Sequence, residues 1–160
     1  MDLIKSNSLP DTIVQEFKKS IRDLHVSLEI NVINKNKSLK LCDPEFFRGC
    51  KVKIPIENDI DPSTDNAQIS GKLASRGILS FEVQDKDRKP NYLIITWAVK
   101  TAMKRGRNSV AITIRDKKLE KENSRHSYKM LHIKQNRKYP GDYINPDNIH
   151  YRISGGITDG

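Results

Sequence analysis

The feature that most constrains the fold is a series of short apolar runs with a period of two, separated by polar turns. Residues 26–33 alternate apolar and polar side chains, and residues 77–83 and 110–114 form similar runs. Residues 92–99 are apolar almost throughout, as in a central strand that is covered on both faces. Many short strands joined by polar turns are typical of β-sandwiches. The pattern predicts a mainly β fold, a β-sandwich with helices on its outside.

A different period marks the N-terminal region. Between residues 11 and 24 the apolar side chains recur three or four positions apart, so they share one face of a helix. These residues are Ile13, Val14, Phe17, Ile21 and Leu24. Asp11 or Thr12 can cap the start of such a helix. We expect an amphipathic helix at 11–24 that either packs on the sheet or lies in a membrane interface.

The remaining organisation is simple. The 160 residues suit one domain, 1–160, in which the sandwich spans 26–153. Residues 115–126 are very polar and predict either a second short helix or a loop. The N-terminus lacks the apolar run of a signal peptide, so a soluble chain is expected. Cys42 and Cys50 are either free thiols or the ends of a small disulfide loop.

Charge gives the main indication of function. The chain has 29 Lys and Arg residues against 20 Asp and Glu residues, a net charge of +9. Such an excess attracts nucleic acid, acidic lipid headgroups or acidic glycans, although it also simply keeps a chain soluble. The densest cluster lies between residues 100 and 109, and no aromatic residue interrupts it, so base stacking is not indicated. Its cations are Lys100, Lys104, Arg105 and Arg107.

Motifs for catalysis are absent from the sequence. No phosphate-binding loop and no Gly-x-Ser-x-Gly motif occurs. Asp59 and Asp61 lie in a polar loop without the apolar surroundings that separate the pKa values of a catalytic pair. The four histidines, each expected at the surface or satisfied by hydrogen bonds, lack metal-ligand spacing; they are His25, His126, His132 and His150. We expect no enzyme, no cofactor and no metal site.

The order of these pieces resembles the actinoporin-like cytolysin superfamily, which includes the fungal fruit-body lectins. The resemblance rests on the helical segment 12–24 with the strand 28–34, on the turn Glu45-Phe-Phe-Arg-Gly49, and on the glycine-led strand 74–81 with the apolar strand 93–99. It covers residues 12–114. It implies a sandwich flanked by two helices. In lytic members the N-terminal helix inserts into a membrane, a role that would fall here on 12–24.

The resemblance also implies a binding surface. Lytic members cage a choline headgroup with aromatic residues just after the apolar strand, where this chain has the basic loop 100–109 instead. Arg48 and the cations of that loop are therefore predicted to contact anionic lipid, with association of several copies on the membrane, or a glycan in a lectin-like relative. A charge-driven nucleic-acid binder is the third prediction. A lytic protein would be secreted and membrane-associated, and a lectin-like one would be cytoplasmic.

Overall fold

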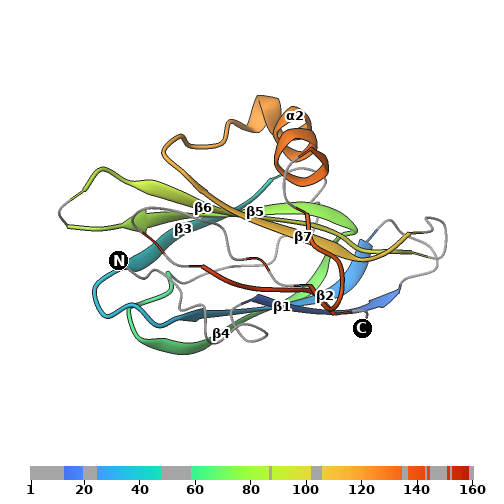
Figure 1. The fold of residues 1–160 in the computed structure, drawn as a ribbon, viewed down its shortest axis with the longest axis horizontal. Helices are drawn as coiled ribbons and strands as arrows, with labels where there is room; N and C mark the ends of the chain where they lie inside the picture. Colours follow the sequence, from blue (N-terminus) through green and yellow to red (C-terminus); the bar gives the residue numbers. More distant parts are fainter. Residues whose placement is uncertain are drawn as a thin grey trace.

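The computed structural model contains two antiparallel β-sheets and a C-terminal helix (Figure 1). One sheet has the strand order β1-β2-β4, with strands Ile13–Lys19, His25–Asn34 and Thr64–Ala74. The other has the order β3-β5-β6-β7, with strands Lys40–Phe47, Arg76–Gln84, Asn91–Ala98 and Ser109–Arg115. The structure describes residues 13–19, 25–47, 59–86, 88–101, 106–134, 137–142, 144, 151 and 153–158. The predicted mainly β fold is confirmed.

The two sheets share one apolar core. Every second side chain of β2 is buried in it, namely Val26, Leu28, Ile30 and Val32. The facing sheet contributes Leu93, Ile95 and Trp97 of β6. Complete burial of one such aliphatic side chain stabilises a fold by about 1.5–3 kcal/mol, so the β2 row alone contributes roughly 6–12 kcal/mol before conformational entropy is subtracted. The apolar residues in the period-two pattern at 26–33 include the side chains that β2 buries in this core.

The four-stranded sheet is covered on its other face as well. Ile78 and Ile94 pack there against Leu119, Tyr128 and Leu131, which come from the C-terminal helix and the chain that leads to it. Figure 1 shows this helix lying over β5, β6 and β7, on the side away from the three-stranded sheet. Burial on both faces explains why residues 92–99 are apolar almost throughout rather than alternating.

The helix spans Lys121–Ile133 and consists of three segments. It begins with a 3₁₀ turn at Lys121–Asn123, continues as α2 at Ser124–Tyr128, and ends in a π-helical turn at Lys129–Ile133. The predicted second short helix therefore exists, but it begins later than residue 115. In the part of the chain that the structure describes, no helix is both long enough and apolar enough to cross a membrane.

The predicted helix at 11–24 is wrong over its described part. Residues Ile13–Lys19 form β1, which pairs antiparallel with β2 from Ile13 opposite Val32 to Lys19 opposite Val26. Helix propensity is a weak preference, and a strand edge with unpaired backbone groups readily accepts a further strand. Of the residues predicted on the helical face, three lie in β1 and two lie outside the described residues: Ile13, Val14 and Phe17 in the first group, Ile21 and Leu24 in the second.

The C-terminal segment closes the core. Tyr151, Ile153 and Ile157 are buried in the same cluster as the two sheets, and Figure 1 shows this segment (red) running between the sheets. Two backbone hydrogen bonds between Ile144 and Gly155 join this segment to residue 144, earlier in the chain. The core thus extends past residue 153, and this segment lies close to the basic loop described next.

Candidate functional site

A buried asparagine builds the base of the basic loop. The side chain of Asn108 is fully buried, directly before β7. Its Oδ1 accepts the backbone N–H of Lys100 at 2.9 Å, and its Nδ2 donates to the carbonyl of Thr158 at 2.9 Å. One side chain therefore joins the two ends of the loop and ties both to the C-terminal segment. The backbone at Lys100 and Asn108 is therefore held in a fixed position against Thr158.

A second segment lies beside the start of β7. Val110 and Lys138 exchange two backbone hydrogen bonds, of 2.9 and 2.8 Å. This pairing places Tyr139 next to the loop, where the guanidinium carbon of Arg107 lies 4.7 Å from the centre of the Tyr139 ring. The guanidinium carbon of Arg137 lies 5.7 Å from the same ring centre. We call Arg107, Arg137 and Tyr139 the Tyr139 cluster.

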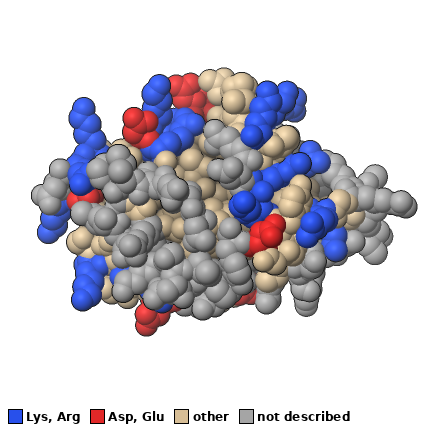
Figure 2. Space-filling model, viewed as in Figure 1, with Lys and Arg blue, Asp and Glu red and all other residues tan. Residues whose placement is uncertain are grey.

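The Tyr139 cluster carries uncompensated positive charge. Both arginines are exposed, and among the described residues neither forms an ion pair. Asp142 is the nearest acid along the chain; it is exposed, and its backbone N–H, not its carboxylate, contacts the turn at Tyr139. Figure 2 shows Lys and Arg side chains spread over much of one face of the molecule. Two guanidinium groups around one ring repel each other and together attract an anion.

The structure brings together only part of the predicted site. Arg107 is in the Tyr139 cluster, and Lys100 lies half-buried at the base of the loop. Lys104, Arg105 and Arg48 lie outside the described residues.

Residues 100–109 contain no aromatic residue, as the sequence analysis states, but Tyr139 comes to Arg107 from a distant part of the chain. The sequence analysis missed both Tyr139 and Arg137. The available signal was the run of basic and aromatic residues at 137–139, before Pro140 and Gly141.

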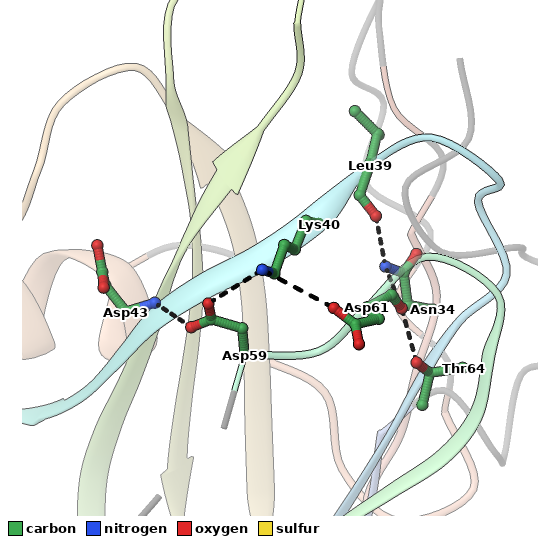
Figure 3. A network of polar contacts seen from close by, with 7 residues as sticks. All are labelled: Asn34, Leu39, Lys40, Asp43, Asp59, Asp61 and Thr64. Carbon is green, nitrogen blue, oxygen red and sulfur yellow. Dashed lines mark hydrogen bonds and ion pairs between the residues drawn. The ribbon is translucent and has the colours of Figure 1, made fainter. Parts of the chain in front are cut away.

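The acidic loop has a structural arrangement of its own (Figure 3). The carboxylates of Asp59 and Asp61 lie 3.4 and 3.9 Å from Nζ of Lys40, and Asp59 Oδ1 also accepts the backbone N–H of Asp43 at 3.0 Å. The hydrogen bond to Asp59 is the main cause that raises the pKa of Lys40. These acids therefore hold their loop against β3 through a lysine that already occupies the space between them.

A histidine joins the helix to the sheet. His132 is 1% exposed; its Nδ1 lies 2.8 Å from Oγ1 of Thr96, its Nε2 lies 2.8 Å from Oγ of Ser109, and its ring stacks on Tyr128. Burial, and secondarily the charge of Arg137, lowers its pKa to about 4. The Ser–His pair has the spacing of a catalytic pair, but Ser109 is only 3% exposed and a threonine stands where a carboxylate orients such a histidine. The network is structural, and His132 is satisfied by hydrogen bonds as predicted.

Metal ligands and the cysteine thiol are the remaining candidates for reactive groups among the described residues. Within them no group of three or more His, Cys, Asp or Glu side chains could hold a metal ion. Cys42 is a buried free thiol, and burial together with the charge of Asp59 raises its pKa to about 11. Cys50 lies outside the described residues. A protonated, buried thiol is a poor nucleophile, so Cys42 is a core residue.

Comparison of this chain with models of protein families, with curated proteins and with solved structures found no match. The resemblance to the actinoporin-like superfamily stays a prediction.

Proposed function

We propose that this protein binds anionic phosphate-bearing surfaces, foremost the headgroups of membrane lipids, through the Tyr139 cluster and the adjoining basic loop. The observation that carries the proposal is the pair of exposed guanidinium groups on one tyrosine ring, without an ion pair to either among the described residues. Binding an anion would relieve the repulsion between the two cations.

The chemistry of arginine favours phosphate. A guanidinium group donates several hydrogen bonds in one plane, which matches two oxygens of a phosphate group. Contact with an aromatic ring restricts the side chain, so less conformational entropy is lost when the anion binds. Lys138, which lies between Arg137 and Tyr139 and is half-buried, adds a further positive charge to this edge.

Lipid is favoured over neutral sugars and nucleic-acid bases because of the tyrosine. Both of those ligands use an aromatic ring as a stacking surface. The ring of Tyr139 already has guanidinium groups within 4.7 and 5.7 Å of its centre, so its stacking surface is contested. Phosphate needs only the cations. The proposal includes no inserting N-terminal helix, since Ile13–Lys19 pairs along β2 as a strand.

Vesicle co-sedimentation tests the proposal. Wild-type protein should bind vesicles that contain phosphatidylserine and not vesicles of phosphatidylcholine alone. The double variant Arg107→Gln/Arg137→Gln should bind about 30-fold more weakly, because one basic residue near an anionic surface contributes about 1 kcal/mol. The control Lys72→Gln/Arg125→Gln removes the same charge from exposed residues on β4 and on α2, and should lose less than about threefold.

The result has clear alternatives. Equal binding by the two double variants would mean that net charge, and not the Tyr139 cluster, drives association. Equal binding to neutral and anionic vesicles would refute anion recognition. Tighter binding to single-stranded RNA, or to a sulfated glycan, than to anionic vesicles at the same salt concentration would replace lipid as the target, and salt dependence alone would not decide the matter.

A further inference from the structure

A hollow lies between the chain that follows β7 and the C-terminal helix. It has a volume of about 840 Å³, within the range of sites for small organic ligands. Arg115, at the end of β7, lines it, whereas Arg107 of the Tyr139 cluster precedes the start of that strand. The length of β7 therefore separates the two places by roughly 20 Å.

The floor of the hollow is apolar. Leu119 and Leu131 line it, and both belong to the buried cluster between the sheet and the helix. Met130 is half-buried and also lines it. A methionine side chain adapts to the shape of a ligand more readily than a branched one does. Because Leu119 and Leu131 are only 3% and 5% exposed, Met130 contributes most of the apolar side-chain surface that the body of a ligand would remove from water.

The rim of the hollow is cationic. Its cations are Arg115, Lys117 and Lys118, and Glu120 is the one carboxylate among the described lining residues. The Oε2 atom of Glu120 accepts a hydrogen bond from Asn123 at 3.2 Å. Lys118 has a long, exposed contact of 4.0 Å with Glu45, and its charge also acts on Glu82. Positive charge therefore dominates the rim.

The arginine of the rim is already oriented. Nε of Arg115 donates to the backbone carbonyl of Lys117 at 2.9 Å, which restricts the orientation of the guanidinium group. Among the described residues, no carboxylate pairs with Arg115 or Lys117. The terminal N–H groups of Arg115 can then meet two oxygens of one anionic group.

We infer that this hollow binds a small amphiphilic anion, a single carboxylate, sulfonate or phosphate group carried on an apolar body. Arg115 and Lys117 would hold the anionic group, and Leu119, Met130 and Leu131 would contact the body. A polyanionic nucleotide suits the site less well, because its sugar would gain nothing from the apolar floor. This inference does not depend on the Tyr139 cluster.

A fluorescent sulfonate probe tests the inference. 8-Anilinonaphthalene-1-sulfonate carries one anionic group on an apolar body, and N-phenyl-1-naphthylamine is the same body without the charge. Titration of the wild type should give saturable binding of one sulfonate probe, with the neutral probe at least about tenfold weaker. Backbone amide shifts measured by NMR should change most between residues 115 and 131.

Two double variants locate the binding. Arg115→Gln/Lys117→Gln, which changes exposed and half-buried side chains only, should weaken the sulfonate about tenfold or more and leave the neutral probe unchanged. The control Lys72→Gln/Lys89→Gln removes the same charge from exposed residues outside both sites and should leave both probes unchanged. The inference is overturned if the sulfonate does not saturate, if both probes bind equally, or if the control variant loses as much binding as Arg115→Gln/Lys117→Gln. Vesicle binding by Arg107→Gln/Arg137→Gln tests the proposed function separately, so failure of one idea is distinguishable from failure of the other.

Discussion

Replacement of Gly77 by alanine should be among the most damaging single substitutions in this fold. Gly77 lies opposite Trp97 in the β5–β6 pair, and the indole ring lies over the glycine. A Cβ atom on residue 77 would overlap Cζ2 of that ring and come within 2.5 Å of Cε2 and 2.9 Å of Cη2. Carbon atoms in contact normally stand about 3.5–4.0 Å apart, so the ring must move.

Displacement of Trp97 requires much free energy because three features hold the side chain in place. The side chain is fully buried, its Nε1 donates to the carbonyl of Ala74 at 2.9 Å, and Phe46 contacts its ring edge to face at 6.2 Å between centres. Overpacking a core costs about 1–3 kcal/mol, and leaving a buried donor and its acceptor unpaired costs about 1–3 kcal/mol more. We expect Gly77→Ala to lower the free energy of unfolding by about 4 kcal/mol, a large share of the roughly 5–15 kcal/mol that stabilises a typical domain.

A double-mutant cycle isolates this clash. Urea unfolding followed by circular dichroism would be measured for the wild type, Gly77→Ala, Trp97→Phe and the combination. Phenylalanine has a smaller ring that lacks the outer indole atoms Cζ2 and Cη2, so Gly77→Ala should cost less than about 1 kcal/mol in that background. An equal cost in both backgrounds would show that the loss of glycine, and not the indole ring, destabilises the strand. A cost below about 1 kcal/mol in the wild type would show that the core yields easily.

Three further outcomes are expected. The pKa of His132 is lowered from 6.5 to about 4 in the folded state, so between these pH values the unfolded chain binds the proton more readily. The free energy of unfolding should therefore fall as the pH drops through this window, by about 3 kcal/mol more than in His132→Gln, and not further below it; identical urea-unfolding profiles against pH would refute this. Tyr128→Phe removes the hydrogen bond from the phenol to the Trp97 carbonyl (2.8 Å) and should cost about 1–3 kcal/mol in thermal unfolding; a loss under about 0.5 kcal/mol would mean that water satisfies the carbonyl. In a Cys50→Ser background, the buried thiol of Cys42 should react with a disulfide reagent only as fast as the chain unfolds; immediate labelling in buffer would contradict its burial.

The hydrophobic pattern predicted most of one sheet and the centre of the other. Four predicted strands match observed ones: 26–33, 77–83, 92–99 and 110–114. Three of them lie wholly within a strand of the structure, and 92–99 extends one residue beyond the end of β6. Each of these segments buries a row of large aliphatic or aromatic side chains. Its hydrophobic period can therefore be recognised from its own sequence, without knowing which strands it pairs with. β4 was not recognised, because its buried face alternates small and large residues, Ala67, Ile69, Gly71 and Leu73, and small residues give a weak signal.

Local pattern was misleading where pairing partners decided the conformation. Residues 13–19 have a period compatible with a helix, yet the neighbouring edge of β2 selects a strand. Residues 121–133 are polar on most sides. They form a helix because Tyr128 and Leu131 pack on the outer face of the four-stranded sheet, and because His132 forms a hydrogen bond with Ser109 of β7. In both cases the deciding contacts come from elsewhere in the chain.

The sequence by itself determined that this is a basic, mainly β protein with a cationic loop after its most apolar strand, because charge and alternation are properties of consecutive residues. It could not show that Arg107 shares a tyrosine with Arg137, since the two arginines are brought together by the backbone pairing of Val110 with Lys138. It also could not show the hollow beside the helix, because that hollow exists only where the helix docks. Composition decided the sign of the chain's net charge, and tertiary structure decided which of its basic side chains lie together.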